Sequence, residues 1–129
     1  YDTLLARIPG LIRPALRASY EGDHAWHLYV VRLPIESLDI DREQVMVELK
    51  DENIGTGLHY KAAHLHEFYR KAYPQTPGSL PVTEHASDRL LSLPLYPGMA
   101  DADVDFTVDA LDRVLSRHRR PGTASTPGQ

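Results

Sequence analysis

Apolar residues recur along the chain at two different spacings, and each spacing predicts a type of element. Residues 1–6 carry leucines at helical spacing, and the Pro-Gly pair at 9–10 ends the helix that they predict. Residues 24–33 are rich in aromatic and β-branched side chains and are apolar at both alternating positions. Because that pattern is typical of a strand covered on both faces, we expect a central strand there. Between these elements, residues 11–19 are ambiguous and residues 21–23 predict a turn.

The most strongly signalled helix spans residues 41–52. Asp41 can cap its first turn, and Gln44, three residues later, completes a capping-box pattern. Asn53 can adopt the left-handed conformation that often ends a helix. The side chains expected to form its buried stripe are Val45, Met46 and Leu49.

A further helix is predicted near the C-terminus, with Asp101 as its cap. Asp103 and Asp105 lie in its first turn and arginines lie near its end, as the helix dipole favours. Its apolar positions fall on a single face, which consists of Val104, Val108, Leu111 and Leu115.

Residues 54–60 predict a second strand that carries two glycines on one side. Gly55 and Gly57 point the same way as His59, whereas Ile54 and its alternate neighbours point the other way. Two glycines on one face weaken a strand, so another backbone or a ligand is expected to approach closely. The spacing alone leaves both alternatives open.

The remaining segments predict shorter elements. Residues 64–72 form a short helix with aromatic side chains, and residues 74–81 form a proline-rich loop. Thr83 caps a short helix that runs to Leu90. Residues 91–96 form a third strand, which a proline interrupts, so we expect it to be short or to lie at a sheet edge.

This order of elements predicts a small α/β (α+β) sandwich, with a sheet of about three strands and helices mainly on one face. Residues 1–120 form the domain, and residues 121–129 a flexible tail. Three strands cannot cover both faces of a doubly apolar strand, and the chain opens on Tyr1 within an apparent helix. We therefore expect a piece of a longer protein, with an apolar patch that is exposed or covered by self-association.

Composition narrows the class of protein. The chain has 129 residues, 42% of them hydrophobic, and a net charge of −4, which fits one soluble globular domain and argues against a strongly basic nucleic-acid binder. No apolar run approaches the roughly 18 residues that a membrane helix needs. The absence of cysteine excludes disulfides, thiolate metal sites and cysteine nucleophiles.

The densest group of reactive side chains follows the glycine-bearing strand, at a place where ligands commonly bind in α/β folds. It contains His59, Tyr60, Lys61, His64 and His66. The spacing of its histidines fits no standard zinc motif, so no metal site is predicted. Two interpretations remain, a ligand-facing role for His59, Tyr60 or His64, and ordinary hydrogen-bonded side chains.

Two other positions could stack on a planar ligand. Trp26 and His27 adjoin in the first predicted strand, and a core role for Trp26 is the alternative. A covalent lysine would have to be Lys50, Lys61 or Lys71, and nothing around Lys61 suggests desolvation. The residues alone thus predict a ligand-contacting α/β domain.

Five segments occur in a specific order along the chain. They are His-Ala-Trp-His-Leu-Tyr-Val-Val-Arg-Leu at 24–33, Ile-Gly-Thr-Gly-Leu-His-Tyr-Lys-Ala-Ala-His at 54–64, Phe-Tyr-Arg at 68–70, Leu-Pro at 80–81 and Leu-Ser-Leu-Pro-Leu-Tyr-Pro-Gly at 91–98. Together they resemble the C-terminal domain of the DegT/DnrJ/StrS nucleotide-sugar aminotransferases, over about residues 1–115. The second segment most resembles the UDP-4-amino-4-deoxy-L-arabinose branch, which acts in lipid A modification.

The resemblance implies a cytoplasmic, homodimeric enzyme that uses pyridoxal phosphate (PLP) to transfer an amino group from glutamate to a keto-sugar nucleotide, such as a UDP-4-keto-pentose. In the family, the lysine that binds the cofactor lies in a preceding large domain, which this sequence does not contain. No catalytic residue is therefore expected in this chain, and the chain alone is expected to be inactive.

The resemblance also ranks the candidate site residues. It implies that His64 lies nearest the cofactor and substrate, followed by His59 and Tyr60. Trp26 and His27 match family positions to which no role is assigned. An alternative from a different class is a free-standing sugar-nucleotide-binding or regulatory module without catalysis.

Overall fold

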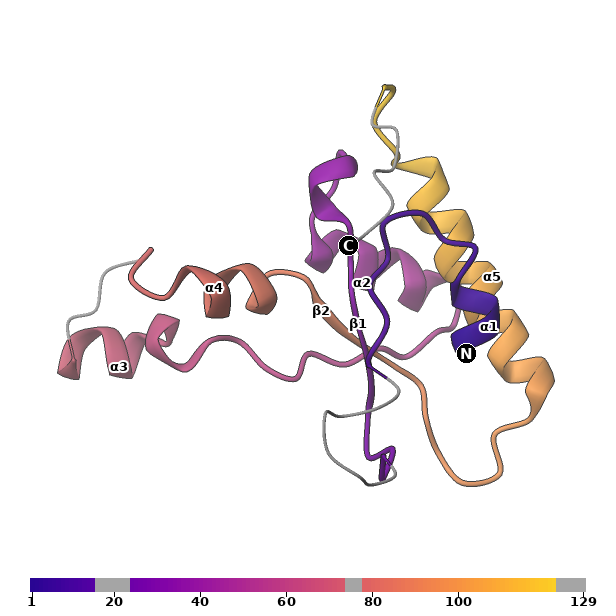
Figure 1. Cartoon of the computed structure of the whole chain (residues 1–129), viewed down its shortest axis with the longest axis horizontal. Helices are drawn as coiled ribbons and strands as arrows, with labels where there is room; N and C mark the ends of the chain where they lie inside the picture. Colours follow the sequence, from indigo (N-terminus) through magenta and orange to yellow (C-terminus); the bar gives the residue numbers. More distant parts are fainter. Residues whose placement is uncertain (16–23, 74–77, 123–129) are drawn as a thin grey trace.

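The computed structural model describes residues 1–15, 24–73 and 78–122 (Figure 1). The turn expected at 21–23 lies outside the described residues. So do residues 16–19 of the ambiguous segment and the part of the expected tail from 123 onward. The mixed α/β class is confirmed. Its elements, in chain order, are α1 (Asp2–Leu5), β1 (Tyr29–Arg32), η1 (Ile35–Ser37), α2 (Arg42–Asp51), η2 (Ala63–Leu65), α3 (Glu67–Ala72), α4 (Pro81–Ser87), β2 (Leu90–Leu93) and α5 (Asp101–Arg117).

The sheet consists of two antiparallel strands, β1 and β2, with Tyr29 opposite Leu93. Isolated backbone pairs extend it on both sides, because Ile12 pairs with Arg32 of β1 and Gly57 pairs with Ser92 of β2. About three strands were expected, and the one predicted at residues 54–60 is reduced to the single pair at Gly57.

The core lies between the sheet and the helices α1, α2 and α5. The long α5 packs against α2 and α1, and Figure 1 shows α1 beside α5. The predicted apolar face of α5 is confirmed, since Val108, Leu111 and Leu115 are fully buried and Val104 packs against them. The other large side chains buried beneath 2% exposure include Leu5, Val31, Leu33, Leu38, Val45, Leu49, Leu91 and Val114.

Local sequence signals fix the ends of α2. The Asp41 carboxylate accepts a hydrogen bond from the Gln44 N–H at 2.9 Å, and the Gln44 side chain accepts one from the Asp41 N–H at 3.1 Å, so the predicted capping box is confirmed. Asn53 has a φ of 63°, the left-handed conformation expected of it. Val45 and Leu49 are buried and Met46 packs against the core, as predicted.

The start of α5 differs from the prediction. Asp101 is the first helical residue, and Ala100 occupies the position before it. The Asp103 carboxylate accepts a hydrogen bond from the Ala100 N–H at 3.0 Å and so satisfies a free donor at the helix start. Asp103 therefore performs the capping that was expected of Asp101.

The first predicted strand is shorter than expected. Residues 24–28 lie outside β1, and Trp26 has a φ of 49°, which is incompatible with an extended strand. Within β1, burial alternates: Tyr29 and Val31 are buried, whereas Val30 and Arg32 are only half-buried. One face of β1 is thus buried and the other partly open, as expected of a strand whose second face this chain cannot cover by itself.

Residues 60–73 and 78–88 form a projection from the body, which we call the arm. Figure 1 shows η2, α3 and α4 extending away from the sheet on the side opposite α5. The helix expected at 64–72 is divided into η2 and α3, because His66 between them has an extended backbone. Thr83 does not cap α4, since that helix begins two residues earlier at Pro81. Proline has no backbone N–H, so it leaves no donor unpaired in the first turn of a helix.

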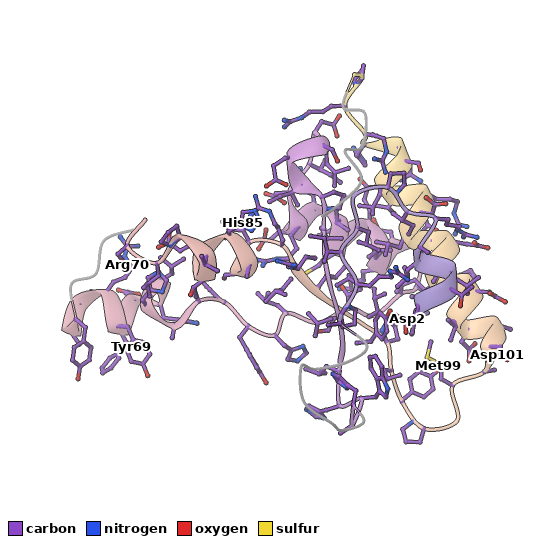
Figure 2. All side chains as sticks on the ribbon, in the orientation of Figure 1. Asp2, Tyr69, Arg70, His85, Met99 and Asp101 are labelled. Carbon is purple, nitrogen blue, oxygen red and sulfur yellow. The ribbon has the colours of Figure 1, made fainter. Side chains whose placement is uncertain are left out.

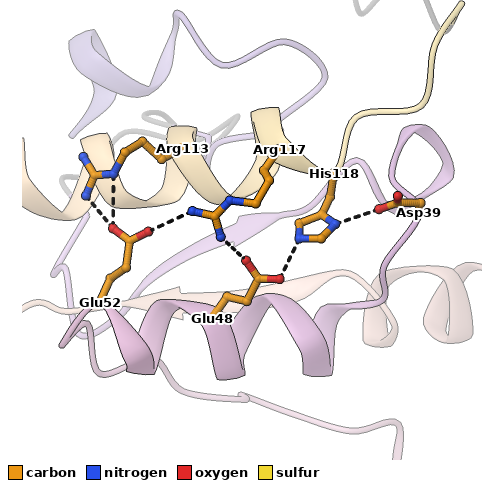
Figure 3. A network of polar contacts seen from close by, with 6 residues as sticks. All are labelled: Asp39, Glu48, Glu52, Arg113, Arg117 and His118. Carbon is orange, nitrogen blue, oxygen red and sulfur yellow. Dashed lines mark hydrogen bonds and ion pairs between the residues drawn. The ribbon is translucent and has the colours of Figure 1, made fainter.

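A polar network joins the end of α5 to α2 (Figure 3). Arg113 and Arg117 of α5 bind the carboxylates of Glu52 and Glu48, which face them from α2 and its C-terminal end. His118 lies between two carboxylates, with Nδ1 2.8 Å from Asp39 and Nε2 2.6 Å from Glu48. Desolvation lowers the pKa of His118, but the two hydrogen bonds outweigh it and leave the pKa above its ordinary value.

Candidate functional site

The arm is attached to the body through a buried serine at the end of α4. The Ser87 hydroxyl accepts a hydrogen bond from the Ala62 N–H at 2.8 Å. The Ser87 carbonyl accepts another from the guanidinium of Arg42, a buried residue in the first turn of α2. Buried groups of this kind are costly to leave unpaired, so Ser87 fixes where both sides of the arm leave the body.

A hydrogen bond links the two sides of the arm. Nε2 of His64 lies 2.9 Å from Oε1 of Glu84, and both side chains are largely shielded from solvent, at 10% and 18% exposure. The Glu84 carboxylate also accepts hydrogen bonds from the backbone N–H groups of Gly78, at 2.8 and 2.9 Å, and of Leu80, at 3.3 Å. His64 first, and then these backbone donors, hold the pKa of Glu84 below its ordinary value.

A pocket of about 570 Å³ opens beside this hydrogen bond. Figure 2 shows Tyr69 and Arg70 at the outer end of the arm, on α3. The walls of the pocket combine aromatic, aliphatic and hydroxyl groups with one imidazole, a combination typical of sites that bind small polar molecules. The lining residues are Ala63, His64, Tyr69, Tyr73, Leu80 and Thr83.

His59 lies on the body, beside β2. Its Nδ1 is 2.8 Å from the hydroxyl of Ser92, and its ring meets the ring of Tyr60 edge to face at 5.0 Å. Tyr60 is 71% exposed. His59 is therefore bound into the fold, whereas the Tyr60 side chain is presented at the surface.

The two glycines before His59 have different surroundings. At Gly57, the backbone pairs with Ser92, and an added Cβ would lie 2.6 Å from Cε1 of the His59 ring. At Gly55, no atom lies within 4 Å of an added Cβ. The question left open by the sequence is thus answered for Gly57, where another backbone and a side chain of this chain make the close approach.

Trp26 and His27 do not join the arm site. Trp26 stacks between His24, at 4.2 Å, and Tyr29, at 5.6 Å, and packs against the core. His27 is exposed. Among the residues that the structure describes, no hydrogen bond, ion pair or ring contact connects Trp26 or His27 to His59, Tyr60 or His64. The candidate residues therefore fall into three separate places.

Tyr29, at the end of the aromatic stack, donates a hydrogen bond from its hydroxyl to the Asp2 carboxylate at 2.6 Å. Burial, and then this carboxylate, raise the pKa of Tyr29. Its ring also stacks on Tyr1 at 4.8 Å. The stack thus fixes α1 to β1 and has a structural role that the sequence did not reveal.

Sequence reasoning missed Glu84 and a second cleft. Glu84 lies in the first turn of a helix, where the helix dipole is enough to explain an acidic residue. The sequence therefore gave no indication that Glu84 contacts a site residue. The cleft, of about 460 Å³, lies between α5 and residues 53–55 and 94–99, and Figure 2 places Met99 and Asp101 at this end of the body. Gly55 lines it, which accounts for the open space at that position.

The described residues do not build a site for a lysine-linked cofactor. All three lysines of the sequence are described and exposed, and Lys71 pairs with Glu67 at 2.6 Å. Desolvation is one way to activate a lysine for reaction with a carbonyl group, and the exposure of all three side chains removes it. Nor does the described part of the chain contain a cluster of three or more histidine or acidic residues suited to a metal ion. None of its helices is long and apolar enough to cross a membrane.

Solved structures share this fold. The chain matches TlmJ, an aminotransferase from Streptoalloteichus hindustanus, with a TM-score of 0.72 and 26% identity over 91% of this chain. It matches S. venezuelae DesV, solved with a ketimine intermediate, with a TM-score of 0.71 and 28% identity over 86% of this chain. A Streptococcus pneumoniae protein solved in its PLP form has a TM-score of 0.79 at 23% identity over 91% of this chain, a likeness of fold. The matched regions are 29%, 28% and 29% of those three chains, so this chain spans under a third of their length.

The sequence itself identifies the family. The model of the DegT/DnrJ/EryC1/StrS aminotransferase family matches residues 1–112, which is most of the chain and includes both strands and the arm. The structural likeness to TlmJ and DesV covers 91% and 86% of this chain. The chain belongs to the DegT/DnrJ/EryC1/StrS aminotransferase family.

Proposed function

We propose that this chain serves as the small C-terminal domain of a PLP-dependent aminotransferase, which transfers an amino group from glutamate to a keto-sugar nucleotide. The observation that carries the proposal is the family match over residues 1–112, with structural likeness to TlmJ and DesV. PLP supplies the electron sink that makes such a transfer possible. The reaction is proposed to take place in the cytoplasm.

The cofactor is proposed to be held mainly by a large domain outside this sequence. The exposure of Lys50, Lys61 and Lys71 supports this, because none of them is placed to react with a carbonyl group. The chain's share of under a third of the solved relatives' length agrees with it. The chain alone is accordingly proposed to be inactive.

The arm is proposed to face that large domain or the second subunit of a homodimer. Six large apolar side chains are exposed on it, a concentration that single scattered surface residues do not produce. They are Tyr60, Phe68, Tyr69, Tyr73, Leu80 and Val82. Within this arrangement His64 is the residue closest to substrate, and His59 and Tyr60 come next. Trp26 and His27 stand apart from them.

The substrate is proposed to be a UDP-4-keto-pentose, used in modifying lipid A or another cell-envelope polysaccharide. The support is the segment Gly-Thr-Gly-Leu-His-Tyr-Lys-Ala-Ala-His at 55–64, which resembles the branch of the family that makes UDP-4-amino-4-deoxy-L-arabinose. An assay of the complete enzyme with UDP-4-keto-pentose and UDP-4-keto-hexose, with glutamate as donor, tests it. Preference for the hexose overturns the choice of sugar, and absence of any amino transfer overturns the enzyme class.

The inactivity of the chain alone is tested by trapping. The 129-residue chain is mixed with PLP and treated with borohydride, and the adducts are located by mass spectrometry. Three exposed lysines should give weak, scattered labelling. Stoichiometric labelling of a single lysine would contradict the proposal. If calorimetry instead finds tight, saturable binding of UDP-sugars to this chain, the alternative of a sugar-nucleotide-binding or regulatory module gains support.

A further inference from the structure

We propose that Glu84 is a positioning residue, which fixes the His64 ring with Nε2–H directed at the Glu84 carboxylate and thereby makes Nδ1 the atom that His64 presents to a ligand. The inference rests on the proposed function only in taking His64 as ligand-facing.

The direction of the hydrogen bond follows from the chemistry of the pair. The pKa of Glu84 is below its ordinary value, so the carboxylate is ionised at neutral pH and can only accept hydrogen bonds. Nε2 of His64, 2.9 Å away, must therefore carry the proton. Water competes weakly for this bond, because the His64 side chain is only 10% exposed.

The other ring nitrogen is left available. Nδ1 of His64 makes no hydrogen bond to any residue that the structure describes. Nδ1 is also not a buried atom without a partner, since the buried side-chain atoms that lack a hydrogen bond in the described ranges are Nε of Arg42 and Nε of Arg89. Because His64 lines the arm pocket, Nδ1 is open to a ligand there. In the neutral ring it accepts a hydrogen bond, and it suits a ligand hydroxyl or N–H group.

Glu84 is itself held firmly enough to act in this way. Its carboxylate accepts bonds from the N–H groups of Gly78 and Leu80, which lie just before α4, while its own backbone is within α4. These bonds restrict rotation of the Glu84 side chain. The ring of His64, which lies in η2 on the opposite side of the arm, is thereby held to α4. The same carboxylate thus sets both the shape of the pocket wall at Leu80 and the orientation of the imidazole.

The test measures the His64 imidazole N–H directly. In the ¹⁵N-labelled 129-residue chain near neutral pH, nitrogen chemical shifts identify the protonated nitrogen, and hydrogen exchange measures its protection. We expect the proton on Nε2 in the wild type. Because hydrogen bonds to charged groups contribute about 1.5–3 kcal/mol, Glu84→Ala should raise the exchange rate by about tenfold or more. Glu84→Gln retains an acceptor oxygen without the charge, so its exchange rate should be intermediate.

Glu67→Gln provides the matched control. It makes the same charge change on the same arm, at an exposed residue that pairs with Lys71 rather than His64. A proton found on Nδ1 in the wild type, or equal exchange rates in Glu84→Gln and Glu67→Gln, overturns the proposal. Glu84→Gln decides the matter if Glu84→Ala does not fold. The measurement needs no turnover, so loss of the proposed aminotransferase activity leaves it unaffected and the two failures are distinguishable.

Discussion

The close approach at Gly57 gives a prediction whose size follows from the structure. A Cβ at this position would lie 2.6 Å from Cε1 and 3.1 Å from Nδ1 of His59. Since real Cβ atoms essentially never come so near another atom, Gly57→Ala must displace the imidazole. The displacement breaks the hydrogen bond between His59 and Ser92, and the Ser92 hydroxyl belongs to a residue that is only 4% exposed.

The expected loss in the free energy of unfolding of Gly57→Ala is best judged against Gly55→Ala. Losing the hydrogen bond and leaving a buried hydroxyl unpaired costs about 1–3 kcal/mol. Replacing glycine by alanine also restricts the unfolded chain, which stabilises the native state by about 0.4–1 kcal/mol where the backbone allows it. Gly55→Ala gains only this second effect, because nothing lies within 4 Å of its Cβ. The unfolded-state effect cancels between the variants, so Gly57→Ala should be less stable than Gly55→Ala by about 1–3 kcal/mol.

Urea denaturation of the wild type and both variants measures this difference in the free energy of unfolding, provided that the three slopes agree. An NMR signal from the His59 ring reports whether the imidazole has moved. Equal stabilities for Gly57→Ala and Gly55→Ala, with the His59 signal unchanged, would refute the reasoning. It would mean that the backbone at Gly57 shifts to admit a methyl group at no cost.

Three further outcomes follow from the core, a cap and a titrating group. Leu111→Ala, at a fully buried position, should lower the free energy of unfolding by about 2–5 kcal/mol in urea denaturation, whereas Val82→Ala, at an exposed position, should change it by less than about 0.5 kcal/mol. Asp41→Ala removes the capping box and should cost about 1 kcal/mol in the same assay, and a cost near zero contradicts the role of the cap. Because the pKa of His118 is raised in the folded state, its protonation stabilises that state: the contribution is complete below the ordinary value of 6.5 and is lost as pH rises through the folded pKa. The stability difference between wild type and His118→Gln should therefore shrink with rising pH, and a difference independent of pH would exclude this linkage.

The sequence predicted best where a few neighbouring residues determine the structure. Asp41 and Gln44 satisfy each other's backbone groups within one helical turn, and Asn53 ends the same helix through its own conformational preference. The apolar face of α5 is likewise a property of one segment, and its periodicity alone identified Val108 and Leu111 as core residues. Such features depend little on the rest of the chain.

The expected strands were predicted less well, because strand limits depend on distant partners. Residues 54–60 have strand-like composition, yet only Gly57 finds a partner in Ser92. Trp26 interrupts the first apolar run with a positive φ that its residue type does not favour, and it is held there by stacking on His24 and Tyr29. Neither outcome could be derived from alternation of apolar and polar residues.

The candidate site was predicted in part. His64 was selected through its resemblance to a family segment, and the structure places it beside a pocket, although its ligand-facing role stays a prediction. Its partner Glu84 lies twenty residues further along, on another helix, and its sequence context suggests only a helix start. A contact of this kind becomes visible only when the two sides of the arm are placed in space.

Stability and candidate chemistry reside in different parts of this chain, and this separation makes the site testable. Of the buried apolar residues, Ala62 alone lies in the described part of the arm, and the others all belong to the body. The arm is held chiefly by polar contacts, through Ser87 at its base and the pair of His64 and Glu84 along its length. Substitutions in the arm pocket should therefore leave the unfolding of the body almost unchanged. If substitutions of His64 abolish amino transfer in the complete enzyme while the body unfolds as in the wild type, the loss reflects the site and not the fold.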